Sequence, residues 1–175
     1  MIIGFIGEPD NDSKMGTGKT LLMTIRVKKH ADRGERIIAN YGLQFKHEKA
    51  NSKVLMELVE SNSNLQACVL ALTEVHVLLE SRRSSSQRNI TLSYLILQTR
   101  KRGVYLYYDS QSIHQVEKRL RDNTDYFVFC KKIAPNYFRY RVFSNSGRRI
   151  AAFVMDGRPY YQLYDTRETV VDFAS

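Results

Sequence analysis

The sequence predicts an α/β domain with a mostly parallel central sheet, flanking helices and a C-terminal antiparallel β extension. Two observations predict this fold class. Short apolar runs alternate with helical segments over the first 130 residues, which is typical of parallel strands joined by helices. The hydrophobic period then changes to two, and turn signals divide the remaining residues into short segments. We expect a single domain over residues 1–175, with a core over 1–130 and the extension over 131–175.

The expected strands of the parallel sheet are apolar runs bounded by turns or loops. The run at 67–72 is apolar throughout, as in strands that are covered on both faces. Gly34 and Gly103 are stop signals for two of the expected helices. The pattern predicts strands at 2–6, 36–40, 67–72, 104–108 and 126–130, and helices at 21–33, 51–59, 84–102 and 113–121. Turn signals at 145–147 and 156–157 predict antiparallel strands at about 137–143, 148–155 and 159–164.

The composition excludes several classes of protein. Hydrophobic residues make up 43% of the 175 residues and charged residues 26%, which is the balance of an ordinary globular domain. The longest apolar run has six residues, whereas a membrane-spanning helix needs about 18. The N-terminus lacks the basic start of a signal peptide, and the two cysteines, Cys68 and Cys130, show no metal-binding spacing. We therefore expect a reduced chain in the cytoplasm, with no membrane span.

The positive charge of the chain is concentrated in its second half. The net charge is +9, and the segment 82–158 holds 16 basic and 5 acidic residues, a net of +11. The remaining residues carry 11 basic and 13 acidic side chains, a net of −2. A basic segment of this kind attracts the phosphate backbone of nucleic acids without reading their sequence. The alternative is a solvated basic surface that faces some other anionic partner.

The strongest local signal is the run Gly16-Thr-Gly-Lys-Thr20, which lies between an expected strand and an expected helix. Glycines let backbone N–H groups turn toward phosphate oxygens, and the helix that follows points its positive end at them. Lys19 can reach the β- and γ-phosphates, and the Thr20 hydroxyl can ligate Mg²⁺. The run therefore predicts a P-loop that binds ATP and Mg²⁺, although Ser13 stands where the strict pattern has its first glycine. The predicted nucleotide-binding residues are Gly16, Thr17, Gly18, Lys19, Thr20 and Leu21.

A second lysine, Lys14, lies five residues before Lys19. This spacing resembles the deviant P-loops of partition and cell-division ATPases, in which the extra lysine contacts the nucleotide across a dimer. Here Met15 replaces one of the glycines of that pattern. Lys14 thus joins the predicted nucleotide-binding residues, and a dimeric partition-type ATPase is an alternative interpretation.

The expected strand at 67–72 is followed by Thr73 and Glu74. P-loop ATPases need a carboxylate near the Mg²⁺ ion and often another that activates water, and both usually follow an apolar strand. Glu74 is placed to polarise the attacking water. Thr73 occupies the position that is normally Asp, and its hydroxyl can hydrogen-bond a metal-bound water without bringing charge. We expect weak Mg²⁺ retention and slow turnover, so a nucleotide-binding, DNA-associated subunit with little hydrolysis is a further alternative.

These motifs occur in a particular order along the chain. The P-loop is followed by Thr73-Glu74, by Arg100-Lys-Arg-Gly103, and by a strand ending near Ser110-Gln111. This order, over roughly residues 1 to 130, resembles the FtsK–HerA superfamily of DNA-translocating and genome-packaging ATPases. It is most similar to zonula-occludens-toxin-like proteins of filamentous phages and to packaging ATPases of archaeal and membrane-containing viruses. The resemblance implies a RecA-like P-loop NTPase fold and assembly into homo-hexameric rings.

The resemblance also implies roles for single residues and for partners. Gln111 would sense the γ-phosphate, and Arg100 would reach the nucleotide of a neighbouring subunit, with Arg82, Arg83 and Arg88 as other candidates. Arg100 could instead be a helix C-terminal cation that interacts with the helix dipole. The implied function is an ATP-hydrolysing motor that translocates or packages double-stranded DNA without sequence preference. A viral capsid is a possible partner, and the location would be the host cytoplasm or the virion.

The phage-assembly subgroup of this superfamily usually carries a transmembrane helix and a further domain. Neither is found in this sequence, which favours the packaging type. Within the extension, Lys131-Lys132 and Tyr137-Phe-Arg-Tyr-Arg141 interleave cations with aromatic rings. Such strands could follow a DNA backbone, with the rings stacked on bases. The alternative, which we favour for the tyrosines, places one face in the core and covers the other with arginine side chains.

Overall fold

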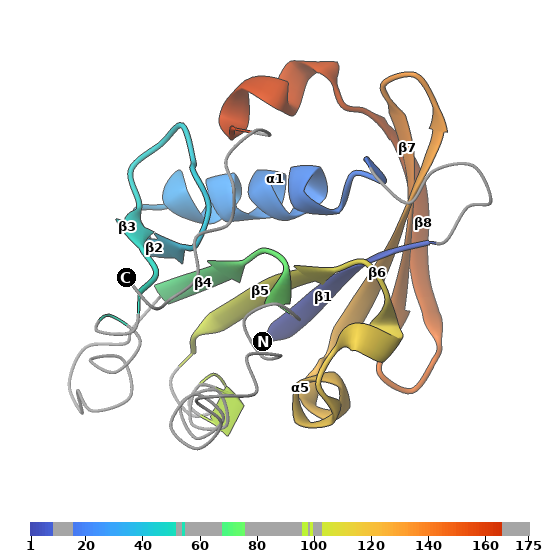
Figure 1. Ribbon diagram of the computed structural model, residues 1–175, viewed down its shortest axis with the longest axis horizontal. Coiled ribbons are helices and arrows are strands. Elements are labelled where there is room, and N and C mark those ends of the chain that lie inside the picture. Colours follow the sequence, from blue (N-terminus) through green and yellow to red (C-terminus); the bar gives the residue numbers. More distant parts are fainter. Residues whose placement is uncertain are drawn as a thin grey trace.

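The computed structural model describes residues 1–8, 16–51, 54, 68–75, 96, 97, 99 and 103–165 (Figure 1). Its strands form one eight-stranded sheet in the order β3-β2-β4-β5-β1-β6-β7-β8. Neighbouring strands from β3 to β6 are parallel, and β7 and β8 continue the sheet in antiparallel pairing. The predicted fold class, a mostly parallel sheet with a C-terminal antiparallel extension, is confirmed. The strands are β1 (Ile2–Gly7), β2 (Arg36–Ala39), β3 (Glu48–Lys49), β4 (Cys68–Leu72), β5 (Tyr105–Ser110), β6 (Tyr126–Ala134), β7 (Tyr137–Ser144) and β8 (Arg149–Asp156).

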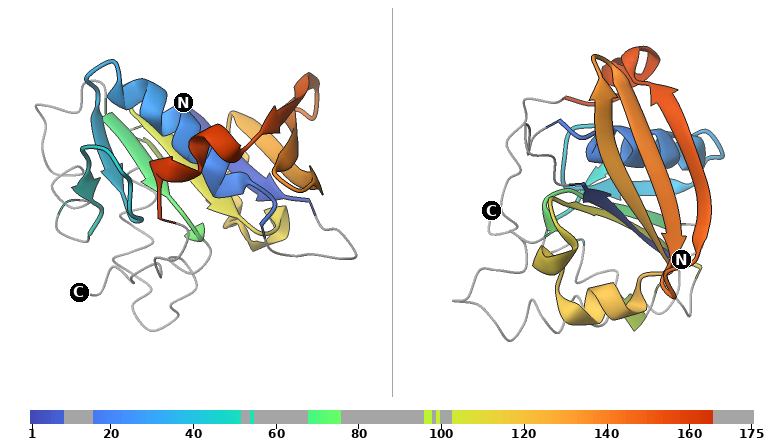
Figure 2. Two further views of the ribbon diagram at one scale, coloured as in Figure 1. Left: turned by 90° about the horizontal axis from the view of Figure 1, so that it is seen from above. Right: turned by 90° about the vertical axis from the view of Figure 1, so that its right-hand side faces the viewer.

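Helices lie on both sides of the sheet (Figures 1 and 2). Helix α1 (Lys19–Ala31) covers one face, where Leu21 and Met23 join an apolar cluster with Phe5. Helix α5 (Lys118–Asn123) lies on the other face, where Leu120 packs in a second cluster with Ile6. Every residue of β4 is buried because this strand is covered from both sides. The continuous apolar pattern therefore correctly predicted a strand that is covered on both faces.

Helix α1 follows the sequence prediction closely. It begins at Lys19 and ends at Ala31, whereas the pattern predicted 21–33. Lys28, Lys29 and His30 lie in its last turn, where positive charge interacts favourably with the helix dipole. His30 is buried, and its ring nitrogens lie 2.7 Å from a Glu35 carboxylate oxygen and 2.8 Å from the Tyr107 hydroxyl. These contacts fix the end of α1 against the start of β2 and against β5.

Two predicted elements were wrong. The helix expected at 113–121 is divided into a 3₁₀ turn, η1 (Ile113–Gln115), and α5. The division arises because Val116 is extended and the Glu117 carboxylate accepts a hydrogen bond from the Leu120 N–H at 3.1 Å, which caps a new helix. The strand expected at 159–164 is instead a 3₁₀ helix, η2 (Arg158–Leu163). Pro159 has no N–H to give to a sheet and fits the first turn of a helix.

Other predictions fall partly outside the described residues. In the helix expected at 51–59, the Val54 N–H donates to the Asn51 side-chain oxygen at 2.9 Å, which is a helix-capping contact. Of the helix expected at 84–102, Ile96, Leu97 and Thr99 are described, and all three are helical. The two-residue strand β3 was not predicted. Strand β5 extends two residues beyond the predicted end at 108, and this difference matters for the site.

The polypeptide continues from the parallel part into the extension without a break. Strand β6 crosses the expected division at residue 130, pairing with β1 on one side and β7 on the other. Both cysteines are free and buried, and burial raises the pKa of the Cys68 thiol to about 11. Within the described part of the chain, no helix has the length and apolar character needed to cross a membrane.

Candidate functional site

The parallel strands bring the sequence motifs to one edge of the sheet. Strand β5 lies between β1 and β4, so the carboxyl ends of these three strands are neighbours. Gly7 ends β1, Thr73 and Glu74 follow β4, and Ser110 ends β5. Helix α1 begins at this same edge (Figure 1). Ligands of open α/β sheets bind at such an edge, next to helix N-termini.

The turn before α1 has the backbone that the glycine pattern predicts. Gly16 and Gly18 have φ values of 75° and 86°, in the left-handed region that favours glycine. A Cβ atom on Gly18 would lie 2.6 Å from a ring carbon of Phe138 and 2.8 Å from the Tyr140 hydroxyl. Gly18 is therefore required both by its conformation and by the close approach of β7.

Thr17 lies between these two glycines and carries an unsatisfied hydroxyl. It is only 5% exposed, and its Oγ1 atom has no hydrogen-bond partner among the residues that the structure describes. A buried hydroxyl without a partner is costly, so such a group is commonly completed by a ligand or a water. The start of α1 thus combines backbone donors, a helix dipole and an available hydroxyl, which together suit a phosphate group.

Gln111 and Lys19 both lie close to Gly7 at the end of β1. A Cβ atom built on Gly7 would lie 3.1 Å from the Gln111 carbonyl oxygen, 3.5 Å from Thr17 Oγ1 and 3.6 Å from Lys19 Cδ. The chain after β5 and the start of α1 therefore both approach the glycine that ends β1. The structure brings these predicted residues to one place, next to the turn.

Asp109 is the main residue of the site that sequence reasoning missed. It is 1% exposed and lies in β5, one residue beyond the predicted end of that strand. The Thr20 hydroxyl donates to one carboxylate oxygen of Asp109 at 2.6 Å, and the Glu74 N–H donates to the other at 2.9 Å. Burial raises the pKa of the Asp109 carboxyl, while these two hydrogen bonds oppose the rise. An acidic residue at the end of an otherwise apolar and aromatic run was the available signal.

Thr73 and Glu74 differ in what holds them. Thr73 is buried, and its N–H donates to the Asn40 side-chain oxygen at 2.8 Å, while its carbonyl accepts from the Asn40 amide at 3.0 Å. Its hydroxyl lies 3.5 Å from the same Asn40 oxygen. Glu74 has φ 50°, a left-handed conformation that is uncommon for a residue other than glycine. Backbone strain of this kind is concentrated at functional sites.

The antiparallel extension contacts the turn and the chain that leads into it. The Tyr140 hydroxyl donates to the Gly18 carbonyl oxygen at 3.1 Å. The Arg141 guanidinium binds the Glu8 carboxylate through two nitrogens at 2.7 and 2.9 Å, and an Arg139 nitrogen lies 3.8 Å from it. Phe138 and Tyr140 are core residues, so one face of β7 packs inward, as the second interpretation of this segment expected. Sequence reasoning gave no sign that this strand would contact the P-loop.

Several predicted residues lie outside the described part of the chain. They are Lys14, Arg100 and the other candidate arginines Arg82, Arg83 and Arg88. Within the described part, no group of three or more His, Cys, Asp or Glu side chains is arranged to hold a metal ion.

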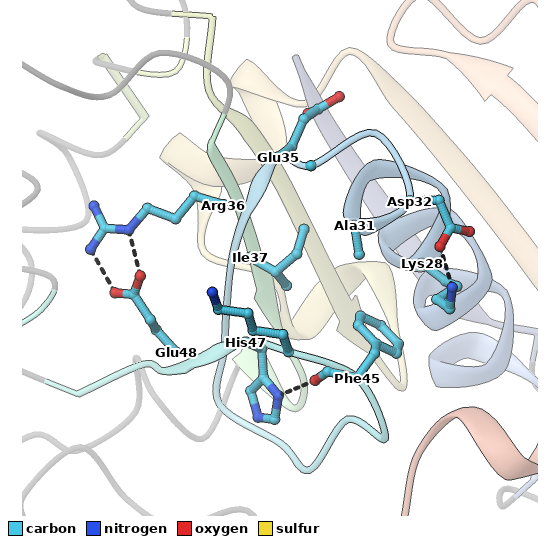
Figure 3. A pocket seen from close by; sticks show the side chains of 11 residues that line it. Lys28, Ala31, Asp32, Glu35, Arg36, Ile37, Phe45, His47 and Glu48 are labelled. Carbon is cyan, nitrogen blue, oxygen red and sulfur yellow. Dashed lines mark hydrogen bonds and ion pairs between the residues drawn. The ribbon is translucent and has the colours of Figure 1, made fainter.

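A separate cavity of about 480 Å³ lies at the opposite end of α1 from Gly18 (Figure 3). Its charged groups largely face one another. Arg36 binds Glu48 through two hydrogen bonds of 2.6 and 2.7 Å, and Lys28 pairs with Asp32. Lys28 also lies over the Phe45 ring, 5.8 Å from its centroid. None of the predicted site residues lines this cavity.

Comparisons with known proteins find similarity in structure only. No family model matches the sequence, and no curated protein matches it. The N-terminal domain of zonular occludens toxin from Neisseria meningitidis matches with a TM-score of 0.67 and 15% identity, over 94% of this chain and 98% of that one. The DNA-packaging ATPase B204 from Sulfolobus turreted icosahedral virus matches with a TM-score of 0.59 and 11% identity, over 87% and 95%.

A third structure has been solved with a nucleotide analogue. The genome-packaging NTPase B204 from Sulfolobus turreted icosahedral virus 2, in complex with ATPγS, matches with a TM-score of 0.53 and 10% identity, over 87% of this chain and 95% of that one. At these identities the similarity establishes the fold. The chain has the RecA-like fold of P-loop ATPases, the fold that the sequence resemblance implied.

Proposed function

We propose that this protein is an ATP-binding and ATP-hydrolysing motor that translocates or packages DNA, of the viral genome-packaging type. The observation that carries the proposal is the buried, unpartnered Thr17 hydroxyl between two left-handed glycines at the start of α1. That arrangement suits the phosphates of a nucleotide. The packaging ATPases among the structural neighbours support the same class of function.

In this proposal the P-loop binds the triphosphate. Backbone N–H groups from Gly16 to Leu21 and the Thr17 hydroxyl face the phosphates, and the Lys19 ammonium neutralises the terminal ones. Lys14 adds a second cation. The Thr20 hydroxyl would hold Mg²⁺, and the Thr73 hydroxyl would be a hydrogen-bonding group beside it. When bound, Mg²⁺ neutralises charge on the phosphate oxygens.

Hydrolysis depends on residues from several strands and from a second subunit. Glu74 polarises the attacking water, and its unusual backbone conformation after β4 supports a functional role. Gln111 senses the γ-phosphate from the end of β5, beside Gly7. Arg100 of a neighbouring subunit in a homo-hexameric ring stabilises charge on the transferred group.

The partner of the motor is double-stranded DNA, which it contacts without reading the sequence. The net charge of +11 over residues 82–158 supports this, because phosphate contacts supply most of the non-specific affinity. For a packaging motor, the viral capsid is a second partner, and the protein acts in the host cytoplasm or in the virion. A nucleotide-binding subunit with little hydrolysis is the second candidate, favoured by the Thr73 hydrogen bonds to Asn40.

Calorimetry and kinetics test the proposal together. We expect the wild-type protein to bind ATP with Mg²⁺ and Lys19→Ala to lose that binding. Lys29→Ala, which changes an exposed lysine in the same helix, should bind as the wild type does. Absence of heat on adding ATP to the wild type would overturn nucleotide binding, and equal binding by Lys19→Ala would overturn the role of Lys19 in it.

DNA-stimulated hydrolysis is then compared in the wild type, Glu74→Gln and Arg100→Ala, with mass measured with and without ATP. Both variants should bind ATP yet lose hydrolysis, and Arg100→Ala should be partly rescued in mixed assemblies. Wild-type turnover equal to that of Lys19→Ala, with binding intact, would favour the second candidate.

A further inference from the structure

The P-loop threonine is already engaged with a carboxylate, and that carboxylate is not where the sequence pattern places it. P-loop ATPases normally have an aspartate directly after this strand, β4, where this chain has Thr73. In the structure the Thr20 hydroxyl donates to Asp109, on the adjacent strand β5, at 2.6 Å. Asp109 and the residue after Thr73 are joined by the Glu74 N–H hydrogen bond of 2.9 Å. The carboxylate thus lies beside the expected position, one strand away.

The chemistry of this contact suits a divalent cation. A hydroxyl that donates its proton to a carboxylate keeps its oxygen lone pairs for another partner. Mg²⁺ prefers oxygen ligands, and in nucleotide sites it is commonly bound through one or two carboxylates together with phosphate oxygens. A carboxylate that is 99% buried is also costly when ionised without a nearby cation, and Lys19 and a metal ion are the cations that a nucleotide-loaded P-loop provides.

The neighbouring residues Glu8, Thr73 and Glu74 make different contacts. The Glu8 carboxylate is bound by Arg141 at 2.7 and 2.9 Å. Thr73 carries no charge and is hydrogen-bonded to Asn40. Glu74 lies in a left-handed conformation that its N–H bond to Asp109 helps to hold. One carboxylate therefore contacts both the residue that would ligate the ion and the backbone of the residue that would activate water.

We propose that Asp109 supplies the carboxylate of the divalent-cation site, in the place that Thr73 leaves uncharged, and that it positions both Thr20 and Glu74. This inference rests on the proposed nucleotide-binding function. Asp109 would thus have two roles: its carboxylate would face the cation, and its two hydrogen bonds position the neighbouring residues. Its negative charge, and not only its shape, is what the cation site requires.

Asp109→Asn removes the charge and preserves the shape. The Asn side-chain oxygen can still accept from the Glu74 N–H, and its amide can donate to the Thr20 hydroxyl. Binding of a non-hydrolysable ATP analogue is measured by calorimetry in Mg²⁺ and in EDTA. We expect Mg²⁺ to tighten analogue binding by the wild type by about tenfold or more. It should tighten binding by Asp109→Asn by less than about threefold, because the variant lacks the negative charge beside the cation. Affinity in EDTA should be similar for the two proteins.

Two further variants separate charge from structure. Asp125→Asn is the control, because the Asp125 carboxylate also accepts a backbone N–H, from Ile2 at 2.7 Å, but at the opposite end of β1. This variant should keep the full Mg²⁺ effect. Thr73→Asp placed in the Asp109→Asn protein returns a carboxylate to the strand next to β5 and should restore most of the effect. If Asp109 had a purely structural role, Thr73→Asp would not restore the Mg²⁺ effect.

The outcomes distinguish the two proposals. If the wild type binds no analogue in either buffer, the proposed function fails. If the wild type binds with a Mg²⁺ effect that Asp109→Asn retains, the function stands and the assignment of Asp109 is overturned. Should Asp109→Asn not unfold cooperatively, Asp109→Ser, which also lacks the charge, is measured in its place with the same two criteria.

Discussion

The Tyr140 hydroxyl donates a hydrogen bond to the Gly18 carbonyl oxygen across 3.1 Å and thereby joins the antiparallel extension to the turn before α1. Tyr140 is fully buried and packs between Phe138 and Phe153, with ring centroids 6.5 and 5.3 Å away. The last strands of the sheet are therefore more than an appendage to the parallel part. They form one wall of the turn that we assign to the phosphates.

Tyr140→Phe should weaken nucleotide binding. It removes one hydrogen bond to the turn and keeps the ring, so we expect the ATP dissociation constant to rise about three- to tenfold, from a net contribution of about 1 kcal/mol. The matched control is Tyr108→Phe, because the Tyr108 hydroxyl is also buried and hydrogen-bonded, to Thr124 at 2.8 Å on the other face of the sheet. Both variants should lose some stability in urea, and only Tyr140→Phe should lose affinity in calorimetry. Equal ATP affinities in the two variants would contradict this.

Gly18→Ala should be more damaging than the same change at Gly34. Both glycines have positive φ, 86° and 78°, so alanine at either position costs about 1 kcal/mol or more in backbone strain. At Gly34 nothing lies within 4 Å of the new methyl group, whereas at Gly18 it would meet Phe138 at 2.6 Å. Urea denaturation should show the larger loss for Gly18→Ala, together with loss of ATP binding. A Gly18→Ala protein as stable as Gly34→Ala would show that β7 can move away from the turn.

The contrast between Gly18 and Asp109 shows what could be predicted from the sequence. The turn at Gly18 follows from local chemistry, since glycines, a lysine and a threonine between a strand and a helix predict a phosphate-binding loop. Asp109 acquires its role from the lateral order of β1, β5 and β4, and no local pattern encodes that order. Tyr140 illustrates the same limit, because alternation predicted that it faces the core but not that it faces Gly18. The segment from Pro159 shows a different limit. Its aromatic residues after a turn signal predicted a strand, but proline has no N–H for a sheet, and the segment forms η2 instead.

Asp109→Asn should stabilise the nucleotide-free protein in a pH-dependent way. Burial raises the pKa of the Asp109 carboxyl above its ordinary value of 3.8, so the folded chain holds this proton more tightly than the unfolded chain. The corresponding stability is present below pH 3.8 and is lost as the pH rises from there through the raised pKa. The asparagine variant does not have this loss. Urea unfolding in EDTA should therefore show an advantage for Asp109→Asn that grows as the pH rises above 3.8, and a constant difference would be inconsistent with this reasoning.

The Glu8 and Arg141 side chains should be energetically coupled. The Glu8 side chain is 12% exposed and the Arg141 side chain 41%, so removing the arginine leaves a nearly buried carboxylate with Arg139 at 3.8 Å. Arg141→Met should cost about 1–2 kcal/mol after allowance for solvent screening, and adding Glu8→Gln should recover part of that loss. A double-mutant cycle by urea denaturation measures the coupling. The exposed pair of Asp156 and Arg158 is the control and should show little coupling.

The same ion pair predicts which cations of the extension take part in DNA binding. Arg141 is already neutralised by Glu8, whereas Lys132, Arg148 and Arg149 are exposed. Each phosphate contact contributes about 0.9 to the slope of log K against log salt concentration for duplex DNA. Replacing the three exposed residues by alanine should reduce that slope by up to about 2.7, while Arg141→Met should leave it nearly unchanged. Fluorescence anisotropy with one duplex at several salt concentrations measures both slopes. If the triple variant keeps the wild-type slope, DNA does not contact this surface, and the basic residues outside the extension become the candidates.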